Sequence, residues 1–264
     1  MGATLPREID GQTIGFATGP NGYDPNRPTV VLIPGAGGSR LSWRNQLEPL
    51  DKTINVIVLE LPGHGETSGD AAADVAIYTD FVIHVIESWG LNKPILAGHS
   101  LGGAITLETA LRRPDLLGGI ILISTGAHLP VNPMLFEGLE KDHQATIGMM
   151  MKWCFTKAAD PAMLADAGKV MAMTPPETLA GDFRACDSFD CRETVHNIDL
   201  PAMVVGGAQD KMTPPAMSEF LCERIPGARL ELVDNAGHIV QEERPDELNA
   251  LILDFARSLF KIAL

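Results

Sequence analysis

Residues 94–104 read Pro94-Ile95-Leu96-Ala97-Gly98-His99-Ser100-Leu101-Gly102-Gly103-Ala104. An apolar strand pattern runs directly into a tight turn, and an apolar helical pattern follows the turn. Strand, turn and helix in this order are typical of a nucleophile elbow, in which a serine projects its hydroxyl from a strained backbone position. Gly98 and Gly102 leave the room that lets the strand and the helix approach each other. We therefore predict that Ser100 is a nucleophile rather than a serine that only caps a helix.

Further short apolar runs alternate with helical patterns along the chain. The expected strands, besides 94–97, are 29–33, 54–59, 118–123, 202–205 and 230–233. Continuous apolar strands favour a parallel sheet that is buried on both faces. Helical spacing of apolar residues over 75–89 and 248–259 predicts helices packed on that sheet. A looser alternation over 7–16, around Asp10-Gly11, predicts an antiparallel hairpin at a sheet edge. The expected fold class is α/β, with a mostly parallel central sheet covered by helices on both faces.

The strand pattern stops between residues 125 and 197. Prolines interrupt the helical stretches of this segment: Pro130, Pro133, Pro161, Pro175 and Pro176. An inserted helical cap fits the segment better than a long loop does. We therefore predict a core made of residues 1–124 and 198–264, and a cap made of residues 125–197. The cap is rich in methionine and also contains Phe136 and Trp153. We predict that these two residues line an adaptable apolar substrate pocket; the alternative is that such side chains only hold the cap helices together.

A serine hydroxyl is a weak nucleophile, so it needs a base, and a carboxylate must hold that base in the right tautomer. His238 lies in a loop between the last apolar run and the final helical pattern. Asp210 lies in the loop after the preceding apolar run. Because open α/β sheets place their sites at the carboxyl ends of strands, both loops should reach Ser100. The order Ser100, Asp210, His238 is the one expected after a nucleophile elbow, whereas Asp199 and Asp234 are weaker candidates for the acid.

Attack on a carbonyl creates an oxyanion, which needs hydrogen-bond donors that are already in place. The first donor should be the backbone amide of Leu101, the residue after the nucleophile. The second should come from the glycine-rich loop Pro34-Gly35-Ala36-Gly37-Gly38, and we choose the amide of Ala36. A loop that cradles phosphate is the rival interpretation of these glycines. The loop here has neither the lysine of a P-loop nor the full glycine spacing of a dinucleotide-binding motif, which argues against that interpretation.

Taken together, these motifs resemble those of the α/β-hydrolase fold family from one end of the chain to the other. The turn Pro62-Gly63-His64-Gly65 is similar to the one after the family's fourth strand, and Trp43 stands where many members have an aromatic residue. One departure is Pro34-Gly35, where the family usually has His-Gly. We interpret His64 and His99 as residues that fix the backbone of their turns.

The resemblance implies a serine hydrolase that cleaves a small apolar carboxylic ester, thioester or lactone through an acyl-enzyme on Ser100. Two alternatives use the same triad: hydrolysis of a carbon–carbon bond in aromatic ring-fission products, and cofactor-free perhydrolysis. A binding module that keeps the pocket without the chemistry is the non-enzymatic alternative. The complete set of Ser100, Asp210 and His238 argues against that alternative, because binding alone requires no base.

The composition excludes several partner classes. The formal charge is −14, from 34 acidic and 20 basic residues, so nucleic acid and anionic membranes are poor partners. The chain starts without the basic and then apolar segment of a secretory signal, and it has no apolar run of membrane-spanning length. These two features predict a cytoplasmic enzyme. The scattered histidines show no metal-binding spacing, so we predict neither a metal nor a cofactor. The expected partner is a small apolar acyl compound, and the sequence leaves the oligomeric state open.

Overall fold

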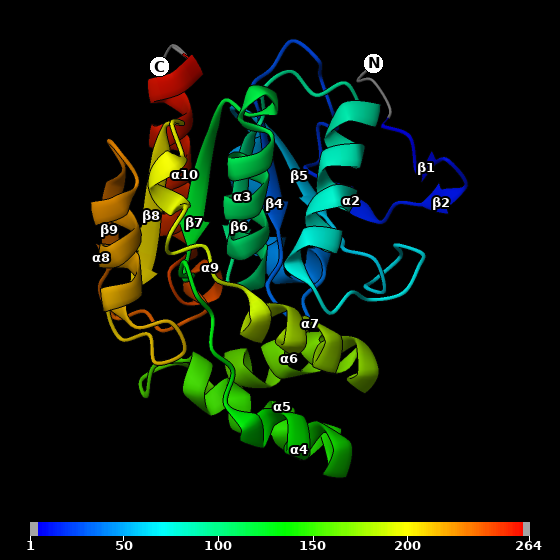
Figure 1. The fold of residues 1–264 in the computed structure, drawn as a ribbon, viewed down its shortest axis with the longest axis vertical. Coiled ribbons are helices and arrows are strands. Elements are labelled where there is room, and N and C mark those ends of the chain that lie inside the picture. Colours follow the sequence, from blue (N-terminus) through cyan, green and yellow to red (C-terminus); the bar gives the residue numbers. More distant parts are fainter. Residues whose placement is uncertain (1–4, 261–264) are drawn as a thin grey trace.

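Figure 1 shows the protein as a computed structural model, which describes residues 5–260. The outermost parts of the predicted core, 1–4 and 261–264, lie outside the described residues. A seven-stranded sheet with the order β3-β5-β4-β6-β7-β8-β9 crosses the molecule. Its strands are β3 (Phe16–Thr18), β4 (Thr29–Ile33), β5 (Asn55–Leu59), β6 (Ile95–His99), β7 (Gly119–Ile123), β8 (Ala202–Gly207) and β9 (Arg229–Val233). Every neighbouring pair is parallel except β3 with β5, which confirms the predicted mostly parallel sheet.

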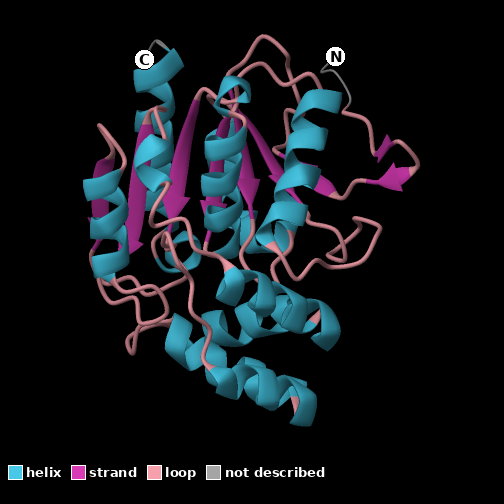
Figure 2. Ribbon diagram, in the orientation of Figure 1, coloured by secondary structure: helices cyan, strands magenta, loops and turns pink. Residues whose placement is uncertain are grey.

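Helices cover both faces of the sheet, as the apolar strands predict (Figure 2). Alternate residues of each central strand face opposite layers, because successive side chains of a strand point to opposite sides. In β4, for example, Val31 packs in the layer of α2 (Val75–Ser88), α3 (Leu101–Arg112) and α8 (Pro215–Arg224). Its neighbour Leu32 packs in the layer of α1 (Arg44–Asp51) and α10 (Pro245–Phe260). The central strands are therefore buried at every position and predominantly apolar.

The predicted hairpin is present, but it does not belong to the main sheet. It consists of β1 (Glu8–Ile9) and β2 (Gln12–Thr13), which form a separate two-stranded sheet. Asp10 and Gly11 have φ values of 49° and 80°, the left-handed backbone that a two-residue hairpin turn of type I′ requires. Between β2 and β3, the amide of Gly15 donates to the hydroxyl of Thr67 at 2.8 Å. After this residue, β3 joins the main sheet as its antiparallel edge strand.

Four helices form a separate layer beyond the carboxyl ends of the parallel strands (Figure 1). They are α4 (Pro133–Lys141), α5 (His143–Cys154), α6 (Pro161–Ala172) and α7 (Pro176–Ser188), and we call these helices and the segments that connect them the cap. Pro133, Pro161 and Pro176 begin their helices, where the missing amide proton costs no hydrogen bond. The segments that flank the cap helices pack on the core instead, through Leu129 and Phe189. Over residues 5–260, no helix has the length and apolarity needed to cross a membrane.

Candidate active site

Ser100 stands at the strained turn between β6 and α3. Its φ of 53° and ψ of −115° are unusual for a residue with a side chain. A Cβ at Gly98 would collide with the backbone of Gly102, and a Cβ at Gly102 would collide with the carbonyl of Ile33. The turn is held by hydrogen bonds from the Ser100 amide to the Ile123 carbonyl, at 3.0 Å, and from the Thr125 hydroxyl to the Ser100 carbonyl, at 2.8 Å. These contacts maintain a strained backbone that presents the serine side chain.

Asp210 and His238 are joined by a hydrogen bond, with 2.9 Å between the Oδ2 and Nδ1 atoms. The Thr213 hydroxyl donates to the same carboxylate oxygen at 2.7 Å, and its oxygen lies 3.2 Å from His238 Nδ1. The amides of Met212 and Thr213 donate to Oδ1 at 2.8 and 3.0 Å. Burial by itself would raise the pKa of Asp210, but the neighbouring His238 and these hydrogen bonds hold the pKa below its ordinary value. Asp210 is therefore an ionised acceptor for the imidazole.

The loop that carries His238 is held from several sides. The His238 amide donates to the Cys154 carbonyl, at the end of α5, at 2.6 Å. The His238 carbonyl lies 2.9 Å from His99 Nε2. Burial and the nearby His238 lower the pKa of His99 to about 3, so its ring is neutral and donates through Nε2. Glu243 accepts hydrogen bonds from the amides of Gly237, at 2.7 Å, and Thr156, at 3.0 Å. The cap thus contacts the His238 loop directly.

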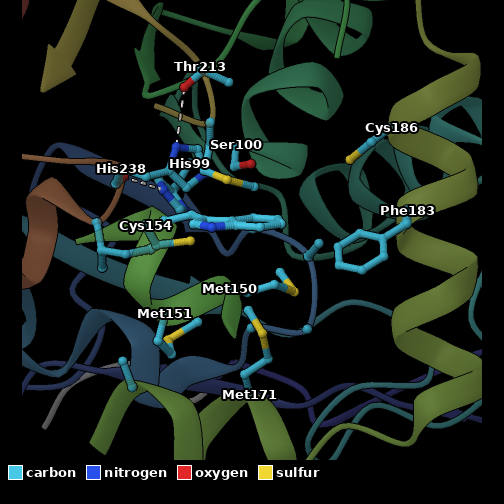
Figure 3. A pocket seen from close by; sticks show the side chains of 18 of the residues that line it. His99, Ser100, Met150, Met151, Cys154, Met171, Phe183, Cys186, Thr213 and His238 are labelled. Atoms are coloured by element: carbon cyan, nitrogen blue, oxygen red, sulfur yellow. Dashed lines mark hydrogen bonds between the residues drawn. The ribbon is translucent and has the colours of Figure 1, made fainter. Parts of the chain in front are cut away.

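Ser100 and His238 line the same cavity (Figure 3). Within the described part of the chain, no direct hydrogen bond links their side chains, and such catalytic bonds are often long before substrate binds. The two weaker acid candidates, Asp199 and Asp234, are exposed, and their side chains make no hydrogen bond with His238. Among these carboxylates, Asp210 alone contacts the imidazole.

The two amides predicted to bind an oxyanion are not engaged elsewhere among residues 5–260: neither the Ala36 nor the Leu101 amide donates to a described acceptor. The next amide of the glycine-rich loop, that of Gly37, is engaged by Asp182 Oδ2 at 2.8 Å. The amide of Gly38 closes a turn onto the carbonyl of Gly35 at 2.9 Å. Within residues 34–38, the amides without a described acceptor are therefore those of Gly35 and Ala36, and Ala36 is the donor that we predict from the sequence.

The cavity has a volume of about 430 Å³ and is lined largely by apolar side chains from the cap. The cap residues include Leu135, Met150, Met151, Trp153, Met171 and Phe183. Trp153 lines this cavity, whereas Phe136 does not: its ring packs in an edge-to-face arrangement with that of Phe183, with centroids 6.2 Å apart. Sequence reasoning missed Phe183, although Leu179, Phe183 and Cys186 follow helical spacing and form the buried face of α7. No cluster of three or more potential metal ligands occurs in residues 5–260.

Comparison with known proteins gives concordant results. A model of the family described as "Alpha/beta hydrolase family" matches residues 30–251. A protein of Rhizobium rhizogenes, provisionally named the carbamate hydrolase RutD, is 29% identical over 89% of this chain and 94% of its own length. The pimeloyl-[acyl-carrier protein] methyl ester esterase of Neisseria meningitidis serogroup B is 28% identical over 86% of this chain and 92% of its own.

The fold is shared with solved structures as well. The crystal structure of the enol-lactonase from Burkholderia xenovorans LB400 superposes with a TM-score of 0.85. The alignment covers 94% of this chain and 97% of that one, with 24% sequence identity. At this level of identity the likeness concerns the fold alone.

Proposed function

Because the chain belongs to the alpha/beta hydrolase family, we propose that it is a serine hydrolase that cleaves a small apolar carboxylic ester through an acyl-enzyme on Ser100. Its relatives are named for hydrolysis, and the chain is a hydrolytic enzyme. One observation supports the proposal most: Ser100 and His238 face one apolar cavity, while Asp210 binds the other side of the imidazole.

The tautomer of His238 follows from its neighbours. An ionised Asp210 can only accept, so the proton of a neutral imidazole lies on Nδ1, the atom 2.9 Å from the carboxylate. The Nε2 atom is then the basic nitrogen, free to take the proton of the Ser100 hydroxyl. After proton transfer, the imidazolium is stabilised by the negative charge of Asp210.

In the acylation step, the Ser100 oxygen forms a bond to the carbonyl carbon of the ester, and its proton moves to His238. The resulting oxyanion accepts hydrogen bonds from the amides of Leu101 and Ala36. The intermediate collapses when the bond to the alkoxy group breaks, and His238 returns the proton to the leaving alcohol. Water then attacks the acyl-enzyme and gives a proton to His238. When the bond to the Ser100 oxygen breaks, His238 returns that proton to the serine, and the acid is released.

The cavity supports an apolar acyl group. Trp153, Phe183 and the methionines of α5 and α6 surround it, and each buried methylene contributes about 0.8 kcal/mol, or roughly a fourfold gain in affinity. The Neisseria relative is named as a methyl ester esterase, which also favours an ester over other acyl compounds. The same steps would hydrolyse thioesters and lactones, since only the leaving group differs.

The test is covalent labelling with a fluorophosphonate, followed by mass spectrometry of the labelled peptide. We expect the label on Ser100, and we expect hydrolysis of para-nitrophenyl esters to fall by about 10⁴- to 10⁶-fold in Ser100→Ala. His238→Ala should cost a similar amount, and the double variant little more, because the residues act as a unit. Ser100→Ala activity within tenfold of the wild type, in protein free of wild-type contamination, would exclude this mechanism.

A further inference from the structure

Gly37, in the glycine-rich loop, has both of its backbone polar groups bound by the cap. Its amide donates to Asp182 Oδ2 at 2.8 Å, and its carbonyl accepts from the Thr174 hydroxyl at 3.0 Å. A Cβ on Gly37 would lie 2.9 Å from Leu179, another residue of α7, and the φ of this glycine is +65°. The cap therefore fits against the loop at a residue that only glycine suits.

Asp182 is fully buried on α7 and is satisfied entirely by groups from outside the cap. Its Oδ1 accepts from the Tyr78 hydroxyl at 2.6 Å, and its Oδ2 lies 2.8 Å from His64 Nε2. The other ring nitrogen, His64 Nδ1, lies 3.0 Å from the Pro62 carbonyl, which can only accept. Both ring nitrogens therefore donate, and the buried pair consists of an imidazolium and a carboxylate. Burial would lower the pKa of His64, but Asp182 raises it above the ordinary value.

This network controls the peptide that follows Ala36. The Asp182 hydrogen bond fixes the plane of the Ala36–Gly37 peptide, and the turn from Gly38 to the Gly35 carbonyl fixes the plane of the Gly35–Ala36 peptide. A trans peptide places its N–H opposite its C=O, so fixing the Gly35 carbonyl also fixes the direction of the Ala36 amide. The amide that we assign to the oxyanion is thus oriented by hydrogen bonds on both sides.

We propose that Asp182 is a positioning residue, which together with His64 and Thr174 makes the geometry of the oxyanion loop depend on the docked cap. This inference rests on the proposed function, in which Ala36 donates to the oxyanion. The cap then has two effects on the reaction: it encloses the acyl group, and it orients a donor that acts on the transition state. A positioning role of this kind affects kcat more than KM, because the oxyanion forms only after substrate binding.

The experiment compares Asp182→Asn with Asp142→Asn, a matched control in which an exposed aspartate of the cap caps α5. Loss of a whole oxyanion donor typically costs about 10²- to 10³-fold in kcat, and a displaced donor costs less. We expect kcat of Asp182→Asn to fall about 10- to 100-fold, with KM within about threefold of the wild type. Asp142→Asn should retain wild-type kinetics, because asparagine also caps helices.

The specific readout is the affinity for an alkyl trifluoromethyl ketone, whose adduct with a serine oxygen carries an oxyanion. Its inhibition constant should rise by the same factor as kcat falls, since transition-state analogues share the affected contacts. The matching methyl ketone, which does not form the adduct readily, should bind unchanged. A fall in kcat without weaker binding of the trifluoromethyl ketone would overturn the positioning role.

A second variant covers the case in which Asp182→Asn fails to fold. Thr174→Val removes only the hydroxyl that donates to the Gly37 carbonyl and leaves the ion pair intact. We expect about a three- to tenfold loss in kcat and in trifluoromethyl ketone affinity. The control is Thr146→Val, which removes a hydroxyl that donates to the carbonyl of Asp142, the residue before α5. If Asp182→Asn is folded, a wild-type kcat and wild-type trifluoromethyl ketone affinity in that variant would overturn the proposal. If Asp182→Asn is unfolded, wild-type values of the same two quantities in Thr174→Val would overturn it.

The parallel Ser100→Ala measurement separates the two levels of inference. An active Ser100→Ala variant would refute the proposed function itself. An inactive Ser100→Ala variant beside a fully active Asp182→Asn variant would leave the serine mechanism standing and refute only the role of the cap in orienting the oxyanion loop.

Discussion

Replacing Asp210 with asparagine tests the proposed mechanism with a change of very few atoms. The amides of Met212 and Thr213 both donate to Oδ1, so the asparagine oxygen should take that position. The new NH₂ group then takes the place of Oδ2, the oxygen that lies 2.9 Å from His238 Nδ1 in the wild type. Because NH₂ donates, Nδ1 must become the acceptor and the ring proton must move to Nε2. A protonated Nε2 cannot accept the proton of Ser100.

The expected loss in kcat for Asp210→Asn is about 10²- to 10⁴-fold, or roughly 3 to 5 kcal/mol of transition-state stabilisation. The KM should change little, because Asp210 does not line the cavity. The assay is steady-state hydrolysis of a para-nitrophenyl ester, with the concentration of active protein determined by fluorophosphonate titration. Retention of hydrogen bonds to Met212 and Thr213 should keep the thermal midpoint close to that of the wild type.

Asp234→Asn is the matched control, since Asp234 is close to His238 in the chain but exposed. It should hydrolyse the ester at the wild-type rate. A kcat for Asp210→Asn within about threefold of the wild type would refute the assignment of the acid. So would a larger loss in Asp234→Asn than in Asp210→Asn.

Two further predictions concern the cap and its buried contact with the core. Trp153→Ala should extend the longest acyl chain that is accepted, with kcat/KM rising about fourfold per added methylene up to the new limit. Phe136→Ala should shift that limit less, because Phe136 lies outside the cavity; identical chain-length profiles for wild type and Trp153→Ala would contradict this. The second prediction concerns His64, whose pKa is raised and whose charged neighbours are Asp182 and Glu60. The raised pKa adds to the free energy of unfolding. This contribution is complete below the unfolded pKa of about 6.5 and is lost as pH rises through the folded pKa. Urea unfolding at pH 6 and pH 9 should therefore show a larger alkaline loss for the wild type than for His64→Gln, and parallel losses would show that the pair is not charged.

Several features were predictable because they are encoded locally. The elbow around Ser100 follows from glycines within two residues of the serine, where any Cβ would strike backbone. The parallel sheet follows from central strands that are predominantly apolar, since both faces of the sheet are covered. The hairpin turn was predictable from Asp10-Gly11, but its attachment to the sheet was not. The edge strand is β3 instead, and the amide of Gly15 just before it is bound by the distant Thr67.

The sequence by itself determined the elbow, the order of the candidate residues along the chain and the presence of a helical segment between two strands. These features follow from the spacing and periodicity of residues that are close in the chain, and such patterns do not depend on where the segment lies in the fold. Only the tertiary structure decided which cap side chains face the cavity, and that Phe183 lines it while Phe136 packs behind that ring. It also decided that Asp182 binds the amide of Gly37, 145 positions away. No local pattern specifies such a contact, because it depends on how two separately formed layers meet.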